Sequence, residues 1–328
     1  MNYSQMKVLI TGGLGLIGSN LAHRLVELGA RVTLLDGLLP GHGGNLWNIR
    51  AIKPALTLHL GDMRDQATLE TCIPGQDLVF NLAGQGGHLD SMLDPLTDLE
   101  LNVRAHLELL ESCRRLNPAV RLVFSSTRQV HGIPRYLPLN ESHPIQPIDI
   151  NGIHKATGEY YHRLYHSAYG MPVTILRLTN TYGAGMRIVD ARQSFLGYWV
   201  RLLLEGKPLP IFGDGRQVRD FNHVDDCVEA LLRAGSNPLA IGKIYLLGGC
   251  EVVSLLDLAS SMARLVPGGG YALVPFPVEN KKIDIGSCCN DFGNIKSDLD
   301  WEPCITLANG LRRTVDYYAE HFAHYVSV

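Results

Sequence analysis

The sequence predicts a doubly wound, parallel α/β fold with a smaller C-terminal α/β lobe. Three observations predict it: short apolar runs alternate with longer amphipathic stretches, a glycine-rich turn follows the first run, and the pattern changes after residue 178. Parallel strands need crossover helices, so this alternation is typical of a Rossmann sheet. We therefore expect a Rossmann domain over residues 1–178. Residues 179–328 should form mainly the lobe, with some elements returning to the first domain.

The composition is that of an ordinary globular protein, with 46% hydrophobic and 19% charged residues among 328. The 29 basic and 32 acidic residues give a net charge of -3, so no basic footprint for nucleic acid or anionic lipid is present. No apolar run approaches the roughly 20 residues that span a bilayer, and the N-terminus lacks a signal-peptide pattern. Seven scattered cysteines without a CxxC pair indicate neither a disulfide framework nor a metal site. We expect a cytoplasmic protein that binds no membrane, nucleic acid or metal.

Short apolar runs in the first half, bounded by Gly, Asp or Pro, are typical of strands. These runs are residues 7–10, 31–35, 56–60, 78–82 and 122–125. The helical spacing of apolar residues predicts helices over 17–28, 65–72 and 99–116, and later over 152–169, before a strand over 173–178. Because the strand runs are continuously apolar rather than alternating, both faces of the sheet should be covered. Gly29 follows the first helix, where a residue free to adopt positive φ is favoured.

The first predicted strand runs directly into a glycine-rich turn that opens a helix, which is the arrangement of a dinucleotide-binding site. The glycines allow the backbone to approach a pyrophosphate, and the helix N-terminus offers free N–H groups to the anion. Asp36 ends the second strand, where a carboxylate can bond both ribose hydroxyls and repel the extra phosphate of NADP. The pattern therefore predicts NAD as the cofactor. The turn and helix supply the candidate cofactor residues Gly12, Gly15, Leu16, Ile17 and Gly18.

Further segments carry a family resemblance over nearly the whole chain. They read GDMRD at 61–65, NLAG at 81–84, FSST at 124–127, LRLTNTYG at 176–183 and RDF at 219–221. In these segments the sequence resembles the extended short-chain dehydrogenase/reductase family, specifically its nucleotide-sugar epimerases and dehydratases. The resemblance implies a nucleotide-diphosphate sugar as substrate and a homodimer as the assembly.

The resemblance also implies roles for individual residues. On the cofactor side it adds Asp62, Met63, Leu82, Ala83 and Lys155. Thr127 matches the catalytic Ser/Thr, and with Ser126 it would hold the reacting hydroxyl group. Asn180 and Arg219 match the residues that hold the substrate diphosphate, for which a planar guanidinium is well suited.

The sequence departs from the family at the centre of the chemistry. The YxxxK motif places a tyrosine one turn before a lysine, whereas here Asn151 precedes Lys155. An amide forms hydrogen bonds but cannot act as a general base. The family's dehydratases use an Asp-Glu pair directly after the threonine, and Arg128 and Gln129 occupy those positions. Both familiar proton shuttles are therefore incomplete.

Histidines near the predicted site are candidates for the missing base, because histidine titrates near neutral pH. His88, together with Asp90, follows the fourth strand at the sheet edge where such folds bind ligands. His131 and His154 are weaker candidates, since a single histidine is more often structural than catalytic. We predict that His88 is the replacement.

Two further features allow alternative interpretations. Arg128 is either a buried structural cation or a ligand for an anionic group of the substrate, such as a uronate carboxylate. Glu159, His162 and His166 have a spacing that could bring metal ligands together on one helix face. We instead expect them to form the polar stripe of a helix that packs in the family's dimer interface.

These observations predict an NAD-dependent nucleotide-sugar epimerase that oxidises and re-reduces C4 of the sugar with a non-standard proton shuttle. Epimerisation is favoured over 4,6-dehydration because it needs no Asp-Glu pair. A dehydratase with a replacement base is the alternative enzyme. A catalytically silent NAD-binding sensor or partner protein is the alternative from another class, and the loss of the tyrosine favours it.

Overall fold

A seven-stranded parallel sheet forms the centre of the protein, whose computed structural model describes residues 2–326. In spatial order the strands are β10 (Ile244–Leu246), β6 (Val173–Leu178), β5 (Arg121–Thr127), β4 (Leu78–Asn81), β1 (Lys7–Thr11), β2 (Arg31–Asp36) and β3 (Leu56–Leu60). Every residue of β4 and β6 is buried, as expected for strands covered on both faces. The predicted doubly wound Rossmann fold is confirmed.

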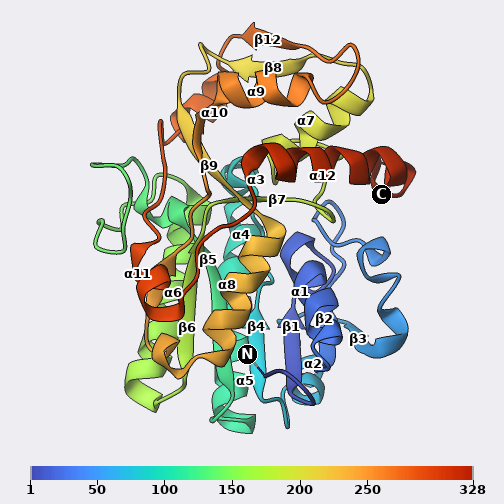
Figure 1. Ribbon diagram of the computed structural model, residues 1–328. Coiled ribbons are helices and arrows are strands. Elements are labelled where there is room, and N and C mark those ends of the chain that lie inside the picture. The colour runs from blue at the N-terminus through green and yellow to red at the C-terminus, as the bar shows by residue number, and fades with distance from the viewer. Residues whose placement is uncertain (1, 327–328) are drawn as a thin grey trace.

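Helices cover both faces of this sheet (Figure 1). One face carries α1 (Leu16–Glu27) and α8 (Val224–Ser236), which contact each other. The other face carries α2 (Gln66–Cys72), α5 (Ala105–Leu116) and α6 (Ile150–Tyr169). Each face has its own apolar core, in which Leu21 and Leu231 represent the first and Leu69 and Leu109 the second.

The strand order places a reversal between β1 and β4. The chain winds from β1 outward through β2 to β3 and then returns to β4 on the other side. The loops after β1 and β4 therefore diverge and leave a crevice at the carboxyl edge of the sheet, where such folds bind ligands.

The chain after β6 builds most of a second lobe, seen at the top of Figure 1. It contains the three-stranded sheet β11 (Val252–Ser254), β9 (Val218–His223) and β7 (Asn180–Tyr182), and the pair β8 (Leu209–Phe212) and β12 (Tyr271–Val274). Its main helices are α7 (Phe195–Leu204), α9 (Leu255–Ala263) and α12 (Leu307–His321). Trp199, Leu258 and Tyr318 pack in its core. From the same half of the chain, α8 and β10 return to the Rossmann sheet.

The region predicted as one helix over 99–116 is more complex in the structure. Here α3 (His88–Leu93) and α4 (Pro95–Leu99) are followed by a π-helical turn (Glu100–Arg104), and only then does α5 begin. The wider turn places Asn102 so that its amide bonds both the N–H and the C=O of Gln85. Such π turns within helices are frequent at functional sites, and this one holds the loop that leads to α3.

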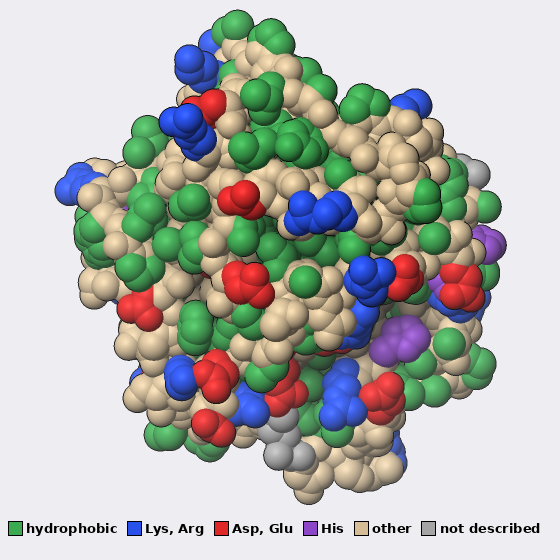
Figure 2. Space-filling view, turned by 45° about the horizontal axis from the view of Figure 1, so that its top comes forward, with side chains coloured by type: hydrophobic (Ala, Val, Ile, Leu, Met, Phe, Trp, Pro, Cys, Tyr) green, Lys and Arg blue, Asp and Glu red, His purple; other side chains and the backbone are tan. Residues whose placement is uncertain are grey.

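The remaining short helices are α10 (Val278–Lys282), α11 (Gly293–Leu299) and α13 (Ala323–Val326). Figure 2 shows basic and acidic side chains interspersed over one face of the molecule, in keeping with a net charge of -3. Among residues 2–326, no helix has the length and apolar character needed to cross a membrane.

Candidate functional site

The turn between β1 and α1 allows an unusually close approach of backbones. Gly12 has a φ of +70°, and a Cβ at this position would lie 2.9 Å from the backbone of Ala83. A Cβ at Gly18 would overlap the carbonyl oxygen of Gly12, so the helix packs on the turn only with glycine there. Within the described chain no side chain caps α1, which leaves its first amides for an anion.

A cavity of about 180 Å³ opens at this turn, along the carboxyl ends of β1 to β4. Its lining includes the predicted cofactor residues Gly12, Gly15, Leu16, Asp36, Asp62, Met63, Leu82 and Ala83. Ile17 and Gly18 lie one step further into α1 and do not line it. The structure thus brings together residues from the ends of four strands, β1 to β4, that the sequence had marked individually.

Asp36 and Asp62 are held in place at the far end of this cavity. The two carboxylate oxygens of Asp36 accept hydrogen bonds from the amides of Leu14 (2.9 Å) and Leu38 (2.8 Å). Each oxygen can accept a further bond, which suits a pair of ribose hydroxyls. Asp62 forms a forked pair with Arg64, whose hydrogen bonds hold the pKa of Asp62 below its usual value.

A second, larger cavity of about 700 Å³ lies between the sheet edge and the C-terminal lobe. Polar side chains from both parts line it: His88, Asp90, Thr127, Arg128, Gln129, Asn180, Arg192 and Arg219. Thr127 ends β5 and is half-buried, and its hydroxyl oxygen accepts a hydrogen bond from the amide of Gln129 at 3.2 Å. The cavity therefore combines a hydroxyl, an imidazole and three guanidinium groups.

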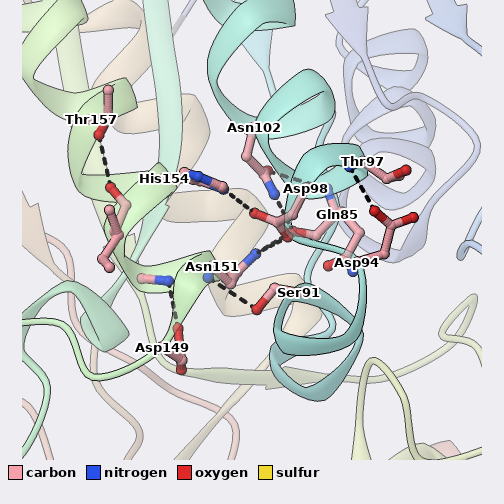
Figure 3. Close-up of polar contacts among 12 residues, drawn as sticks. Gln85, Ser91, Asp94, Thr97, Asp98, Asn102, Asp149, Asn151, His154 and Thr157 are labelled. Carbon is pink, nitrogen blue, oxygen red and sulfur yellow. Dashed lines mark hydrogen bonds and ion pairs between the residues drawn. The ribbon is translucent and has the colours of Figure 1, made fainter.

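Asn151, in the first turn of α6, is buried and fully engaged with neighbouring elements (Figure 3). Its side-chain amide donates to the carbonyl oxygen of Gln85 (2.8 Å) and to Asp98 Oδ2 (3.2 Å). Its backbone amide donates to the hydroxyl of Ser91 at 3.1 Å. Asn151 thus binds the segment around α3 and does not line either cavity.

Lys155 lies one turn later and is also buried. Its ammonium group comes so close to Gly84, in the lining of the smaller cavity, that a Cβ there would be 2.9 Å away. Nζ also lies 5.4 Å from the centre of the Phe124 ring. Lys155 forms no hydrogen bond or ion pair with residues 2–326, so its donors remain for a ligand.

The predicted polar stripe of the long helix was wrong for Glu159 and His162. Glu159 is buried and forms a forked ion pair with Arg177 of β6, at 2.9 Å and 2.6 Å. His162 is buried beside Asn81. The hydroxyl of Ser126 donates to Glu159, which directs it away from the larger cavity. These groups form an internal hydrogen-bonded network. Within residues 2–326, no group of three or more His, Cys, Asp or Glu side chains is arranged to hold a metal ion.

Of the candidate histidines, His88 alone lines the larger cavity. His131 is fully buried between Arg177 and the carbonyl of Pro144, and burial together with the Arg177 charge lowers the pKa of His131 to about 4. His154 forms an ion pair with buried Asp98 at 2.7 Å. His88 Nδ1 lies 3.0 Å from a carboxylate oxygen of Asp149, and its side chain is 38% exposed.

The predicted diphosphate residues meet in the same cavity but already have protein partners. Asn180 donates to the carbonyl oxygen of Asp220 (3.1 Å) and accepts from Arg128 Nη2 (3.2 Å). Arg219 bonds Asp284 (3.3 Å) and the carbonyl oxygen of Gly286, and burial with the nearby Arg128 charge lowers the pKa of Arg219 to about 10. By contrast, Arg128 Nη1 is buried without a partner in the described chain.

Comparison with known proteins decides the family. Residues 8–248 match the NAD dependent epimerase/dehydratase family. The chain belongs to this family. It is 31% identical to a Methanocaldococcus jannaschii protein provisionally described as a UDP-glucose 4-epimerase, over 94% of this chain and 97% of that one.

Solved structures of similar proteins agree with this assignment. An epimerase from Methanothermobacter thermautotrophicus superposes with a TM-score of 0.91 at 28% identity, covering 98% of this chain and 94% of that one. The dTDP-glucose 4,6-dehydratase of Streptomyces venezuelae, solved with NAD bound, gives 0.87 at 28% identity, covering 97% and 98%. NAD is the cofactor of this epimerase/dehydratase protein, and the glycine turn, free helix N-terminus and Asp36 fit it.

The sequence analysis did not single out Asp149, which the structure places next to His88 at the start of α6. Asp149 is the N-cap of α6, and its Oδ1 accepts from the amide of Gly152 at 2.6 Å. An aspartate directly before a predicted helix is a recognisable capping signal. Its second contact, with His88, joins positions 61 residues apart and has no signal in local spacing.

The buried ammonium of Lys155 predicts a pH-dependent stability. Burial lowers the pKa of Lys155 to about 8, although Asp98 and Glu159 oppose the shift. The unfolded chain, with a lysine pKa near 10.4, binds more protons between these values, so the free energy of unfolding rises with pH across this window. Below pH 8, the buried positive charge of Lys155 lowers the free energy of unfolding of the NAD-free protein by about 3 kcal/mol.

Replacing Lys155 by methionine should therefore stabilise the NAD-free protein at pH 7 and lose that advantage above about pH 10.4. Urea denaturation of both proteins at pH 7 and pH 10.5 measures the difference. Lys243→Met, which removes an exposed partner of Asp298, is the control. An equal effect of Lys155→Met at both pH values would contradict the prediction.

Proposed function

We propose that this protein is a nucleotide-sugar 4-epimerase in which His88 replaces the missing tyrosine as the proton shuttle. The observation that supports it is the placement of His88 and Thr127 in the lining of one cavity, which shares Gln193 with the lining of the cofactor cavity. Arg128 and Gln129, where dehydratases carry an acid pair, favour epimerisation over dehydration.

Each residue has a defined task in this proposal. The Thr127 hydroxyl holds the reacting sugar hydroxyl, and His88 Nε2 removes its proton and later returns it. NAD, when held by the glycine turn, the N-terminus of α1 and Asp36, would supply a reversible hydride acceptor for C4 of the sugar. Lys155 orients the nicotinamide ribose, and Asn180 and Arg219 exchange their present partners for the diphosphate.

Arg128 adds a preference for a sugar with an acidic group. A buried guanidinium without a carboxylate partner is costly, and a substrate anion beside it would remove that cost. Because Arg128 directly follows Thr127, a carboxylate on the sugar ring, as in a uronate, is the proposed ligand.

Arg128→Met should weaken binding of UDP-glucuronate by about 10- to 100-fold, which is the worth of one charge-assisted hydrogen bond. Binding of UDP-glucose should change less than about threefold. Isothermal titration calorimetry of the NAD-loaded protein with both ligands measures the contrast, with Arg128→Lys as the charge-conserving control. Equal losses for both ligands would place Arg128 on the diphosphate instead.

The lobe over residues 179–328 is proposed to carry most substrate contacts, and residues 1–178 most NAD contacts.

We also propose a homodimer, because α6 exposes the apolar side chains of Ile153, Tyr160 and Leu164 on one side. Sedimentation velocity of the purified protein tests the dimer.

The first test of the activity uses protein purified without added cofactor and incubated with UDP-, dTDP-, CDP- and GDP-sugars. Proton NMR and mass spectrometry follow the sugar. A product of unchanged mass with an inverted C4 supports the proposal. Loss of water would indicate a dehydratase with a replacement base, and no turnover despite bound NAD would indicate the silent sensor.

A further inference from the structure

A buried carboxylate, that of the α6 N-cap residue Asp149, lies next to the imidazole of His88. Asp149 has a fully buried side chain, and its Oδ2 lies 3.0 Å from His88 Nδ1 and accepts a 2.8 Å hydrogen bond from Gln129 Nε2. Burial would raise the pKa of Asp149, but the contact with His88 and hydrogen bonds from Gly152 and Gln129 outweigh it and keep the pKa below its usual value. The carboxylate is therefore charged and fixed.

The imidazole has one inner and one outer edge. Nδ1 is buried and lies 3.0 Å from Asp149 Oδ2, and it has no hydrogen-bond partner of good geometry within residues 2–326. Because the side chain is 38% exposed and lines the larger cavity while Nδ1 is buried, we expect Nε2 to be the ring nitrogen that faces the cavity. The Nδ1 contact is not yet a straight hydrogen bond, which is common in catalytic pairs before the substrate binds.

We infer that Asp149 is a positioning residue that makes His88 a base. With its Nδ1 proton directed at Asp149, the ring must present an unprotonated Nε2 to the cavity. When Nε2 takes the sugar hydroxyl proton, an N–H bond forms as the O–H bond breaks, and Asp149 stabilises the resulting imidazolium without itself taking a proton. This inference rests on the proposed role of His88.

Asn151 completes the arrangement by fixing the segment that carries His88. It bonds the carbonyl of Gln85, three residues before His88, and the hydroxyl of Ser91, three residues after it (Figure 3). Both ends of the short segment are thus attached to the first turn of α6. The position that holds the tyrosine in the family's motif here anchors the residue proposed to replace it.

The other charged groups around α3 are arranged differently. Asp90 is on α3 itself, Asp98 on α4 is paired with His154, and Arg128 and Arg192 line the cavity beyond the ring. Asp149 supplies the ion-pair contact of His88 in the described chain. Removing this one charge should therefore change both the tautomer and the basicity of the ring.

Asp149→Asn in the full-length, NAD-loaded protein tests the inference. Asparagine also caps helices well, so α6 should remain folded. Nitrogen-15 NMR of the imidazoles, with His88→Gln to identify the signal, should show the Nδ1–H tautomer in the wild type and its loss in the variant. The acid limb of kcat/KM should move to lower pH, and kcat should fall by no more than the 10²- to 10⁴-fold loss expected when the base itself is removed.

Asp65→Asn is the matched control, because Asp65 caps α2 in the same way through the amide of Thr68. It should change neither the His88 tautomer nor kcat. If Asp149→Asn does not fold, the wild-type tautomer decides: an Nε2–H form of His88 overturns the inference. An unchanged tautomer in Asp149→Asn also overturns it. If Asp149→Asn loses the Nδ1–H tautomer but the wild type turns over no sugar nucleotide, the Asp149–His88 pair is supported. The proposed 4-epimerase activity is then contradicted.

Discussion

Replacing His88 by alanine should lower kcat of the proposed 4-epimerase reaction by about 10²- to 10⁴-fold, the usual contribution of a positioned general base. The imidazole faces the larger cavity together with Thr127, and neither Asn151 nor the buried His131 can take its place. NAD content should be unchanged, because His88 does not line the cofactor cavity. Steady-state kinetics with the preferred nucleotide sugar measure the loss.

Two variants separate a chemical role of His88 from a structural one. Added imidazole should restore part of the activity of His88→Ala, whereas His88→Gln should stay inactive because an amide cannot exchange the proton. His59→Ala, on the edge strand β3, is the control and should retain full activity. Full activity of His88→Ala would refute the proposed shuttle.

Replacing Arg177 by methionine should lower the free energy of unfolding by about 3–5 kcal/mol, the range for breaking a buried ion pair from one side. The side chains of Arg177 and Glu159 are only 3% and 1% exposed. Without Arg177 the Glu159 carboxylate would keep only the hydroxyl of Ser126 as a hydrogen-bond donor in the described chain. Urea denaturation at pH 7 measures the change.

Matched variants show whether the effect comes from the unpaired charge. Arg24→Met breaks the surface ion pair between Arg24 and Glu27, whose side chains are 49% and 62% exposed. It should change the free energy of unfolding by less than about 1 kcal/mol. The double variant Arg177→Met, Glu159→Gln removes both charges and should recover much of the loss. A single-variant loss below about 1 kcal/mol would contradict the expectation.

The backbone geometry of the glycine turn and the place of Asp36 at a strand end could be predicted from the sequence. Gly12, Gly18 and Asp36 act through local geometry, a turn and a strand end, so their spacing along the chain is sufficient. The expected strand over 173–178 and the helix ending before Gly29 also match, since burial on both faces and a positive φ leave local signals.

The interior of α6 could not be predicted in the same way. Glu159 and His162 look like a solvated stripe when their spacing alone is considered, yet both are buried. The partner that permits this for Glu159 is Arg177, on a neighbouring strand. A buried charge is tolerated only when paired, and pairing across elements is not visible in helical periodicity.

From the sequence alone one can recognise the Rossmann sheet, the glycine turn and the asparagine at position 151, because each depends on residues close together in the chain. The tertiary structure was needed to see that Asp149 lies beside His88 and that Nη1 of Arg128 has no partner within residues 2–326. These facts depend on the packing of α3 against α6 and of the lobe against the sheet edge. The physical reason is that contacts between distant segments are set by how whole elements pack, and sequence spacing records only what lies within one element.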